Sequence, residues 1–366
     1  MQKREQCFEM YAHPSIYRPK ERKLKVYFSE PVNGVNKDTG LLLLIPGFGG
    51  NANSNVYKKM RNLFADKYNL IVLQCDYFGW EFMQQPNNIS VNLDKESLFK
   101  IFNKKEIQYI FKDNNFFDRL LETSSKYGYN IICNEILNED LTNFNDMGIM
   151  QALDNLSAVI SLIEIIKDNG YEFDERKVMI YGHSHGAYLA YLCNAFAPNL
   201  FSVIIDNSAW LFPVYLKSNR FVNKIYGNTL VSVQFEYLAK TIDYDEELLY
   251  LPLLYKKFHN NCKIICYHGT DDNLISNIDK KNFAKNINNL IYNEISPSRV
   301  DGQIFRSTQH GLNADFIKMF DYAMKTDVSF PKQKSISLNN VLYRTKKNIY
   351  YFDYNNLVPI LRINEH

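Results

Sequence analysis

Apolar runs recur along the chain, and between them lie segments in which apolar residues repeat at helical spacing. Residues 41–45, 70–75 and 178–181 are almost wholly apolar, which is typical of strands buried on both faces of a parallel sheet. Residues 146–166 carry an apolar face with the period of a helix, and Gly170 follows them. Strands that alternate with amphipathic helices predict an α/β fold, in which a mostly parallel central sheet has helices on both faces.

The same pattern predicts the outer elements of this fold. Alternating residues at 7–11 and 24–28 predict edge strands at the start of a mixed sheet. In the tail, residues 341–343 and 349–352 predict a hairpin added to one edge. Further strands are predicted at 201–205, 262–267 and 303–306, and further helices at 277–289 and 313–325.

Two long stretches interrupt the alternation of strands and helices. Residues 82–145 contain short helical patterns at 95–103 and 115–126, and they predict either an insertion packed over the carboxyl edge of the sheet or a mobile segment. Residues 211–258 predict a second, cap-like insertion over a substrate pocket. The chain is therefore expected to form one domain over residues 1–366, with these two insertions and a C-terminal extension at 335–366.

A glycine-bounded serine follows the apolar run at 178–181. Gly182, His183, Ser184, His185 and Gly186 fit the pattern G-x-S-x-G, and helical spacing resumes directly after them. A strand, a tight turn and a helix in this order predict a nucleophile elbow, in which the serine sits on a strained turn and only glycine fits at the flanking positions. The alternative is a glycine-rich turn whose serine caps the next helix.

A serine hydroxyl needs a histidine to accept its proton, and that histidine needs an acid to fix its tautomer. In this architecture the acid and then the histidine follow the serine along the chain, each after the carboxyl end of a strand. Of the seven histidines, His310 has this position, in a polar turn after a predicted strand and before a predicted helix. The alternative is an ordinary loop histidine.

The acid is predicted in the segment that starts at His268. This segment, His-Gly-Thr-Asp-Asp-Asn-Leu-Ile, resembles the H-G-x-x-D-x-x-[VI] segment that carries the acid in many serine hydrolases. Aligned in this way, Asp272 is the acid and Asp271 its exposed neighbour. Asp206, at the end of the preceding strand, is a second candidate, although a structural role with hydrogen bonds to loop amides fits it better.

The negative charge that develops on the substrate oxygen requires two backbone N–H donors. One is expected from His185, the residue after the serine. The other is expected from Phe48, in the glycine-rich loop after the strand at 41–45, with Gly49 as the next choice. The alternative is that the glycines of this loop only make the turn.

Composition narrows the function classes. A net charge of +2 gives no reason to expect nucleic-acid binding, and no G-x-G-x-x-G or Walker sequence predicts a nucleotide cofactor. His183 and His185 lie without a further ligand set at metal spacing, so neither a metal nor another cofactor is expected. Six scattered cysteines, and the lack of an apolar leader or of a run long enough for a bilayer, predict reduced thiols in a cytoplasmic protein. The sequence specifies no oligomeric state.

With the 182–186 turn, Asp272, His310 and the 46–50 loop in place, the chain resembles the α/β-hydrolase superfamily over residues 20–80 and 146–326. Pro46 stands where many relatives have a histidine. The elbow is similar to those of the serine esterase and prolyl-oligopeptidase-like branches. The whole chain also resembles an uncharacterised bacterial family that accompanies surface-glycan and flagellar-sugar loci.

This resemblance implies a serine hydrolase that cleaves an ester through an acyl-enzyme. The implied substrate is an acyl ester of a small molecule or of a carbohydrate such as a glycan. Three alternatives remain: an acyltransferase that uses the same residues on a glycan hydroxyl, a serine peptidase, and a non-catalytic binding scaffold.

Overall fold

The computed structural model describes residues 5–91, 95–356 and 358–365. The other positions (1–4, 92–94, 357 and 366) lie outside the description, although the predicted domain, first insertion and C-terminal extension include some of them. The chain divides into two compact units, whereas one domain with separate insertions was expected. Unit 1 comprises residues 1–83, 141–214 and 243–366, and unit 2 comprises residues 84–140 and 215–242. Residues 243–258, which the sequence placed in the second insertion, therefore belong to unit 1.

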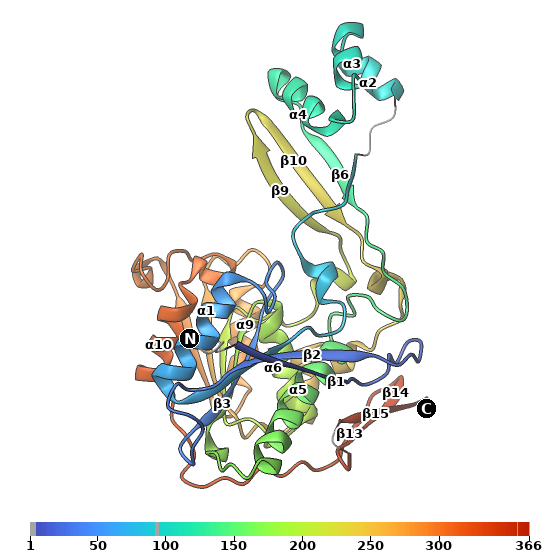
Figure 1. Cartoon of the computed structure of the whole chain (residues 1–366). Coiled ribbons are helices and arrows are strands. Elements are labelled where there is room, and N and C mark those ends of the chain that lie inside the picture. Colours follow the sequence, from blue (N-terminus) through green and yellow to red (C-terminus); the bar gives the residue numbers. More distant parts are fainter. Residues whose placement is uncertain (1–4, 92–94, 357, 366) are drawn as a thin grey trace. The chain divides into compact units, whose positions relative to one another are not determined.

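The main sheet of unit 1 has the strand order β1-β2-β4-β3-β7-β8-β11-β12. Strands β1, β2 and β3 of this sheet are labelled in Figure 1. The pairs β1–β2 and β2–β4 are antiparallel, and the pairs from β4 to β12 are parallel, which confirms the predicted α/β fold with a mostly parallel central sheet. The central strands consist almost entirely of buried residues, as their apolar runs predict. The strand bounds are β1 Glu5–Tyr11, β2 Lys23–Ser29, β3 Gly40–Ile45, β4 Leu70–Cys75, β7 Val178–His183, β8 Val203–Asn207, β11 Lys263–Gly269 and β12 Leu290–Ile295.

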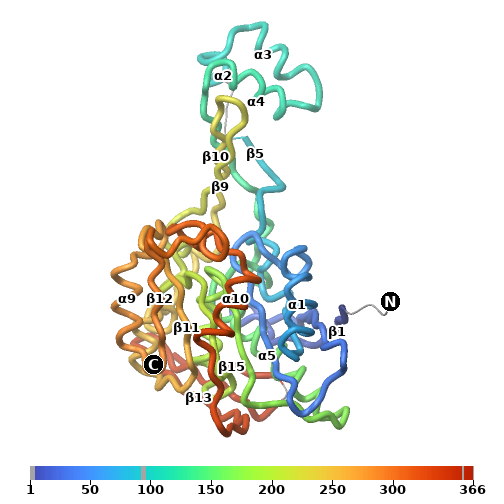
Figure 2. Tube along the Cα trace, turned by 90° about the vertical axis from the view of Figure 1, so that its left-hand side faces the viewer, coloured from blue at the N-terminus to red at the C-terminus, as the bar shows by residue number. Residues whose placement is uncertain are grey.

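Helices cover both faces of this sheet. Side chains of α1 and α10 pack in one core cluster with alternate residues of β3, β4, β7, β8 and β11. Figure 2 shows the backbone traces of these two helices. Helices α5 and α6 pack against one another and against β4, β7 and β8. The helix bounds are α1 Asn55–Tyr68, α5 Ile149–Asp168, α6 His185–Phe196, α7 Glu246–Leu249, α8 Leu251–Lys257, α9 Asn277–Lys285 and α10 Phe316–Thr326. Short 3-10 turns lie at Trp80–Met83, Glu175–Lys177, Val214–Leu216, Leu238–Thr241, Pro297–Arg299 and His310–Asn313.

Helix α5 is long and apolar enough to cross a membrane by length and composition, which the sequence analysis did not anticipate. Its most apolar window has a mean hydropathy of 1.6, but 89% of that window is buried inside the protein. A helix that is apolar all round and enclosed by its own domain has the character of a core helix.

The strand predicted at 303–306 is absent from the described structure. The Oδ1 atom of Asp301 accepts hydrogen bonds from the N–H groups of Gln303, Ile304 and Phe305, so a carboxylate binds the donors that a strand would use for pairing. The last strand of the main sheet is instead β12, which begins where the predicted helix was expected to end.

The tail forms a separate sheet and not a hairpin on an edge of the main sheet. Its strands are β13 Val341–Arg344, β14 Asn348–Asp353 and β15 Ile360–Glu365. The hydroxyls of Tyr343 and Tyr354 donate to the carbonyls of Ala195 and Phe196, both at 2.7 Å. These carbonyls belong to the last turn of α6, where no partner exists within the helix, so the tail caps this helix.

Unit 2 is held together by strands from both of its segments. Its sheet has the order β5-β6-β10-β9, and β6 of the first segment pairs in parallel with β10 of the second. The strands are β5 Ile89–Val91, β6 Ile131–Glu135, β9 Arg220–Tyr226 and β10 Thr229–Phe235, and the helices are α2 Lys95–Ile101, α3 Lys104–Ile110 and α4 Phe116–Tyr127. Helices α2 and α4 confirm the two predicted short helices, whereas the strands and α3 were not predicted.

Candidate active site

The turn between β7 and α6 has the geometry of a nucleophile elbow. Ser184 has φ 54° and ψ −119°, a conformation that non-glycine residues rarely adopt. A Cβ atom added at Gly182 would lie 2.4 Å from the Cα of Ala187, and one at Gly186 would lie 2.1 Å from the carbonyl oxygen of Ile45. Both positions therefore require glycine. Within the described structure Ser184 makes no side-chain cap on α6, which disfavours the capping alternative.

The structure brings together the serine, histidine and acid that the sequence singles out. The hydroxyl of Ser184 donates to Nε2 of His310 at 2.7 Å. Nδ1 of His310 lies 2.8 Å from Oδ2 of Asp272. The Asp272 side chain is fully buried and that of His310 is 14% exposed, so solvent approaches the pair from the histidine side.

The surroundings of Asp272 keep it ionised. Burial alone would raise the pKa of this carboxyl, but the hydrogen bond and charge of His310 and the N–H of Ile275 outweigh burial, and the pKa is lowered. Its Oδ1 atom accepts the N–H groups of Leu274 and Ile275 at 2.8 and 3.0 Å. A buried carboxylate fixed in this way holds the proton of His310 on Nδ1 and leaves Nε2 to accept the serine proton.

His268 forms part of the wall around the acid. Its Nε2–H donates to the carbonyl of Ile275 at 3.1 Å, and its Nδ1 lies 3.7 Å from Asp272. Burial, with a smaller effect of the Lys280 charge, lowers the pKa of His268 to about 4, so this ring is neutral at pH 7. His268 therefore excludes water from the acid without competing with His310.

The loop that carries His310 is pinned to the end of β11. The N–H of Asp271 donates to the carbonyl of Thr308 at 3.0 Å, and the hydroxyl of Thr308 donates to the Asp271 carboxylate at 2.5 Å. A Cβ atom at Gly269 would lie 2.0 Å from the carbonyl oxygen of Thr308, so the two loops are in direct backbone contact. Asp271 is exposed, as the sequence predicts, but it also anchors the histidine loop, a role that the sequence analysis missed.

The loop after β8 contacts both the serine and the histidine segment. The carbonyl of Asn207 accepts the N–H of Ser184 at 2.7 Å. The hydroxyl of Ser208 accepts the N–H of Gly311, the residue after His310, at 3.1 Å. Ser208 has φ 58°, a second non-glycine residue in the left-handed region beside the site. This loop therefore fixes the spacing between the two predicted catalytic segments.

A buried ion pair anchors the same loop. Asp206 and Lys280 are 2.9 Å apart, and both side chains are fully buried. The Oδ1 atom of Asp206 accepts the N–H of Ala209 at 2.7 Å, and Lys280 donates to the Ala209 carbonyl at 3.0 Å. The structural role expected for Asp206 is thus confirmed. Its lysine partner was not anticipated.

The two histidines that flank Ser184 have different partners. The ring of His183 packs against Phe316, with centroids 4.7 Å apart. His185 donates from Nε2 to Oε1 of Gln151 at 2.6 Å, and Gln151 donates in turn to Asn145 at 2.9 Å. Burial lowers the pKa of each histidine to about 3, so both rings are neutral at pH 7. Among the described residues, no group of three or more His, Cys, Asp or Glu is placed to hold a metal ion.

The expected oxyanion donors lie on either side of Ser184. His185 is the first residue of α6, so its N–H has no acceptor within the helix and lies at the positive end of the helix dipole. A Cβ atom added at Gly47 would lie 3.1 Å from the Cβ of Ser184, so the loop that carries Phe48 passes directly beside the serine. The N–H of Gly49, the second choice, donates to the Met83 carbonyl at 2.9 Å and is thereby occupied.

Comparison with known proteins places the sequence in one family. Residues 6–241 match the family described as "Protein of unknown function (DUF2920)". The chain belongs to this family. The match covers the elbow and all of unit 2 except Ile242, and it ends before Asp272 and His310. No protein with a curated description matches the sequence.

Solved structures of esterases and related enzymes resemble the chain at low identity. Est1E from Butyrivibrio proteoclasticus, solved with ferulic acid, is 15% identical, and the match covers 83% of this chain and 93% of that chain with a TM-score of 0.44. Thermogutta terrifontis esterase 2, phosphonylated by sarin, is 13% identical over 88% and 97% of the two chains, with a TM-score of 0.45. A dienelactone hydrolase from Anabaena variabilis is 12% identical over 88% and 96%, with a TM-score of 0.41. Nothing about the activity of this chain follows from likenesses at this level.

Proposed function

We propose that the protein is a serine hydrolase that cleaves a carboxylic ester. The observation that carries this proposal is the continuous hydrogen-bond chain from Ser184 through His310 to Asp272, built on a strained elbow. A serine, a histidine and a buried acid in this geometry are the groups that acyl transfer to a serine requires. The non-catalytic alternative would leave this strained and mutually supporting arrangement without a role.

In the first half of the reaction, Oγ of Ser184 attacks the acyl carbonyl and its proton moves to Nε2 of His310. The tetrahedral intermediate then breaks its bond to the alcohol oxygen, and His310 returns the proton to the leaving alcohol. In the second half, a water molecule loses a proton to His310 and attacks the acyl-enzyme, and Ser184 recovers its proton as the carboxylic acid leaves. Asp272 remains ionised throughout and holds the imidazolium in place.

The negative charge on the substrate oxygen is assigned to the N–H groups of His185 and Phe48. Removal of one such donor costs roughly 2.7–4 kcal/mol of transition-state stabilisation in other serine enzymes. The His185 N–H is fixed because the side chain of this residue is tied to Gln151. The ring of Phe48 is stacked on Trp210, with centroids 5.4 Å apart, which holds the loop that carries the second donor.

The surroundings of Ser184 favour an uncharged acyl group. Phe48 is partly buried next to the serine, and the neighbouring His183 and His185 rings are neutral at pH 7. We therefore propose an acyl ester of a small molecule or of a glycan as the substrate class, with water as the acceptor. We place the activity in the cytoplasm, because all six cysteines lie in the described part of the chain as free thiols.

An active-site-directed fluorophosphonate tests the nucleophile. We expect the wild type to form a covalent adduct and Ser184→Ala to form none, whereas Ser298→Ala, on an exposed 3-10 turn, reacts like the wild type. Equal labelling of the wild type and Ser184→Ala would overturn the proposal.

Turnover is then measured on p-nitrophenyl esters of increasing chain length, with acetylated sugars alongside. Release of free acid that requires Ser184 supports hydrolysis. Acyl transfer to a sugar hydroxyl that outpaces the release of free acid would instead identify a transferase that uses the same three residues.

A further inference from the structure

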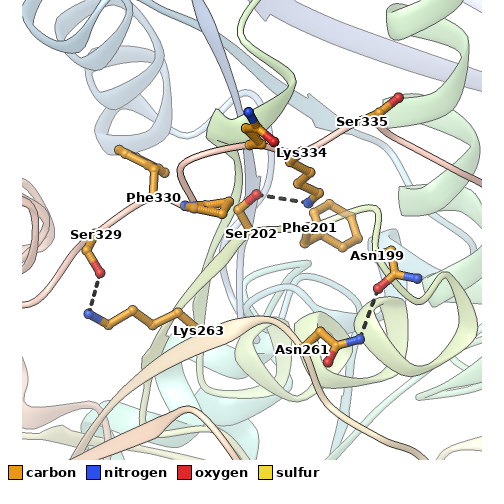
Figure 3. A pocket seen from close by; sticks show the side chains of 11 residues that line it. Asn199, Phe201, Ser202, Asn261, Lys263, Ser329, Phe330, Lys334 and Ser335 are labelled. Atoms are coloured by element: carbon orange, nitrogen blue, oxygen red, sulfur yellow. Dashed lines mark hydrogen bonds between the residues drawn. The ribbon is translucent and has the colours of Figure 1, made fainter.

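A cavity of about 460 Å³ lies at the amino ends of β8 and β11 (Figure 3). It is lined by residues from 199–202, 261–263 and 329–335, and we call it the amino-end pocket. Its volume falls within the range of roughly 300–1,000 Å³ that is usual for small-molecule sites. Ser184, Asp272 and His310 follow the opposite, carboxyl ends of the strands. The seven residues of β11 separate the two ends by about 20 Å, at about 3.3 Å per residue.

Two lysine ammonium groups line the amino-end pocket, and among the described residues both donate hydrogen bonds only to neutral oxygens. Lys263 donates to the hydroxyl of Ser329 at 2.8 Å, and Lys334 donates to the hydroxyl of Ser202 at 2.8 Å (Figure 3). Lys334 also donates to the carbonyl of Leu200 at 3.0 Å. An ammonium has three donors, so each lysine retains capacity for a further acceptor.

The lining carries positive charge and no carboxylate of its own, and the nearby Glu175 carboxylate acts on Lys334 through its charge, without an ion pair among the described residues. No Asp or Glu belongs to it, and across the residues that the structure describes, neither lysine has a carboxylate within ion-pair distance. Burial lowers the pKa of Lys334 to about 8, so this group remains mostly charged at pH 7 although it has lost much of its hydration. A desolvated cation with only neutral partners is stabilised when an anion binds beside it.

The rest of the lining is apolar or supplies amide groups. Phe201 and Phe330 contribute aromatic rings and Pro331 contributes an aliphatic one. The side-chain amide of Asn261 donates to that of Asn199 at 3.2 Å, which fixes one wall. Three apolar rings among hydroxyl, amide and ammonium groups allow a site to bind an organic ligand by both its head group and its body.

We infer that the amino-end pocket binds a small organic anion, whose carboxylate or phosphate group is held by Lys263 and Lys334 and whose apolar body packs on Phe201 and Phe330. This site is separate from the one that contains Ser184 and does not rest on the hydrolase proposal. The shared ligand chemistry is an anionic head group on a planar or aliphatic body.

Isothermal titration calorimetry on the full chain tests this inference with four probes: benzoate, phenyl phosphate, inorganic phosphate and benzyl alcohol. We expect one or both aromatic anions to bind, with the tighter of the two identifying the preferred head group. Benzyl alcohol lacks the charge and should not bind, and inorganic phosphate lacks the ring and should bind more weakly than phenyl phosphate. Added salt should weaken binding.

Substitution of the lysines locates the bound probe. We expect Lys263→Gln and Lys334→Met each to raise the Kd about tenfold or more, as for the loss of a hydrogen bond to a charged group. The matched control Lys332→Gln removes an exposed lysine that does not line the pocket, and it should leave the Kd unchanged. Lys263 is only partly buried, so its variant tests the site even if Lys334→Met fails to fold.

Three results would overturn the inference. The first is that neither aromatic anion binds at millimolar concentration. The second is that Lys263→Gln, correctly folded by circular dichroism, binds the anion as the wild type does. The third is that a Ser184 adduct with the fluorophosphonate abolishes binding, since the anion would then occupy the candidate active site.

Discussion

The charged side chains at the two ends of the main sheet differ in their partners. At the carboxyl end, Asp272 is bonded to His310 and to two backbone N–H groups, and Asp206 is paired with Lys280. At the amino end, Lys263 and Lys334 are bonded only to neutral oxygens around a cavity. One end is therefore electrostatically complete before any ligand arrives, which suits chemistry on a neutral ester. At the other end, neither lysine forms an ion pair with a carboxylate of the described residues, although the charge of Glu175 acts on Lys334, and this arrangement suits anion binding.

The backbone differs between the ends as well. At the amino ends, the residues in the left-handed region are asparagines, which tolerate this conformation; they are Asn69, Asn199 and Asn289. Around the carboxyl ends, the non-glycine residues in this region include one asparagine, Asn313, and three residues of types that tolerate it less, Ser184, Ser208 and Leu312. A residue held in this conformation costs roughly 1–3 kcal/mol, and such residues occur most often at active sites and ligand-binding sites. The strained residues therefore lie at the end of the sheet where we propose that the reaction takes place.

The largest expected effect comes from the acid at the carboxyl end. Asp272→Asn should lower kcat on p-nitrophenyl acetate about 10⁴-fold, because an amide in this position no longer holds the productive tautomer of His310. The neighbouring variant Asp271→Asn is the matched control, since that side chain anchors Thr308 but does not contact His310. It should lower kcat less than about tenfold, the equivalent of one neutral hydrogen bond. Similar losses in the two variants would show that the acid has been misassigned.

The next effect compares a fully buried lysine at the carboxyl end, Lys280, with a partly buried one at the amino end, Lys334. Lys280→Met leaves the Asp206 carboxylate buried without its partner and should lower the free energy of unfolding by about 3–5 kcal/mol. Lys334→Met leaves only a hydroxyl and a carbonyl without their donor and should cost about 1–3 kcal/mol. Urea unfolding at pH 7 measures both, and the double variant Asp206→Asn/Lys280→Met should recover part of the first loss. Equal losses for the two lysines would contradict the difference in charge compensation.

The sequence singled out the residues that the structure brings together at the carboxyl end because each of them follows from a local pattern. The elbow needs glycine on both sides of Ser184 within five residues, and the acid follows its strand in a short motif that begins at His268. His310 was identified as the candidate base because the other six of the seven histidines could be excluded by their positions. Lys280 could not be recognised, because Lys281 beside it looks the same in sequence and only the packing of α9 buries one of them.

Unit 2 was missed for a different physical reason. Its sheet depends on the pairing of Ile131 with Val231, two residues 100 positions apart (231 − 131). The alternation in β6 is hidden, since Ile132 is 56% exposed while Glu135 is buried. Strand β12 is half-exposed and lacks a long apolar run. For this reason the sequence predicted the last strand of the main sheet at 303–306 and not at Leu290–Ile295. Local periodicity does not record pairing between distant segments.

Because His183 and His185 are buried in their neutral form, the free energy of unfolding of the protein depends on pH in the acid range. Burial lowers the pKa of His185 to about 3, whereas the unfolded chain titrates near 6.5. Below pH 6.5 the unfolded chain therefore takes up a proton that folded His185 does not, and the free energy of unfolding falls as the pH decreases. The contribution of this one residue at pH 5 is about 2 kcal/mol, at about 1.4 kcal/mol per pH unit.

Urea unfolding of the wild type and His185→Gln at pH 7, 6 and 5 measures this slope. The glutamine variant should lose less stability between pH 7 and 5 than the wild type, by about 2 kcal/mol, whatever its stability at pH 7. His183→Gln should behave similarly, because burial and the neighbouring His310 lower the pKa of His183 to about 3 as well. Parallel pH profiles for the wild type and both variants would show that these rings are not held neutral.

The smallest expected effect tests whether the amino-end pocket and the candidate active site act independently. Lys263→Gln should leave kcat/KM on p-nitrophenyl esters within about twofold of the wild type, or about 0.4 kcal/mol. The reason is distance: about 20 Å of strand lies between this ammonium and the residues after β11, and a partly exposed charge is screened over about 8 Å at physiological ionic strength. Steady-state kinetics with and without saturating phenyl phosphate completes the test. A change above about tenfold in either measurement would show that the two ends are coupled, and the amino-end pocket would then regulate the reaction at the other end of the sheet.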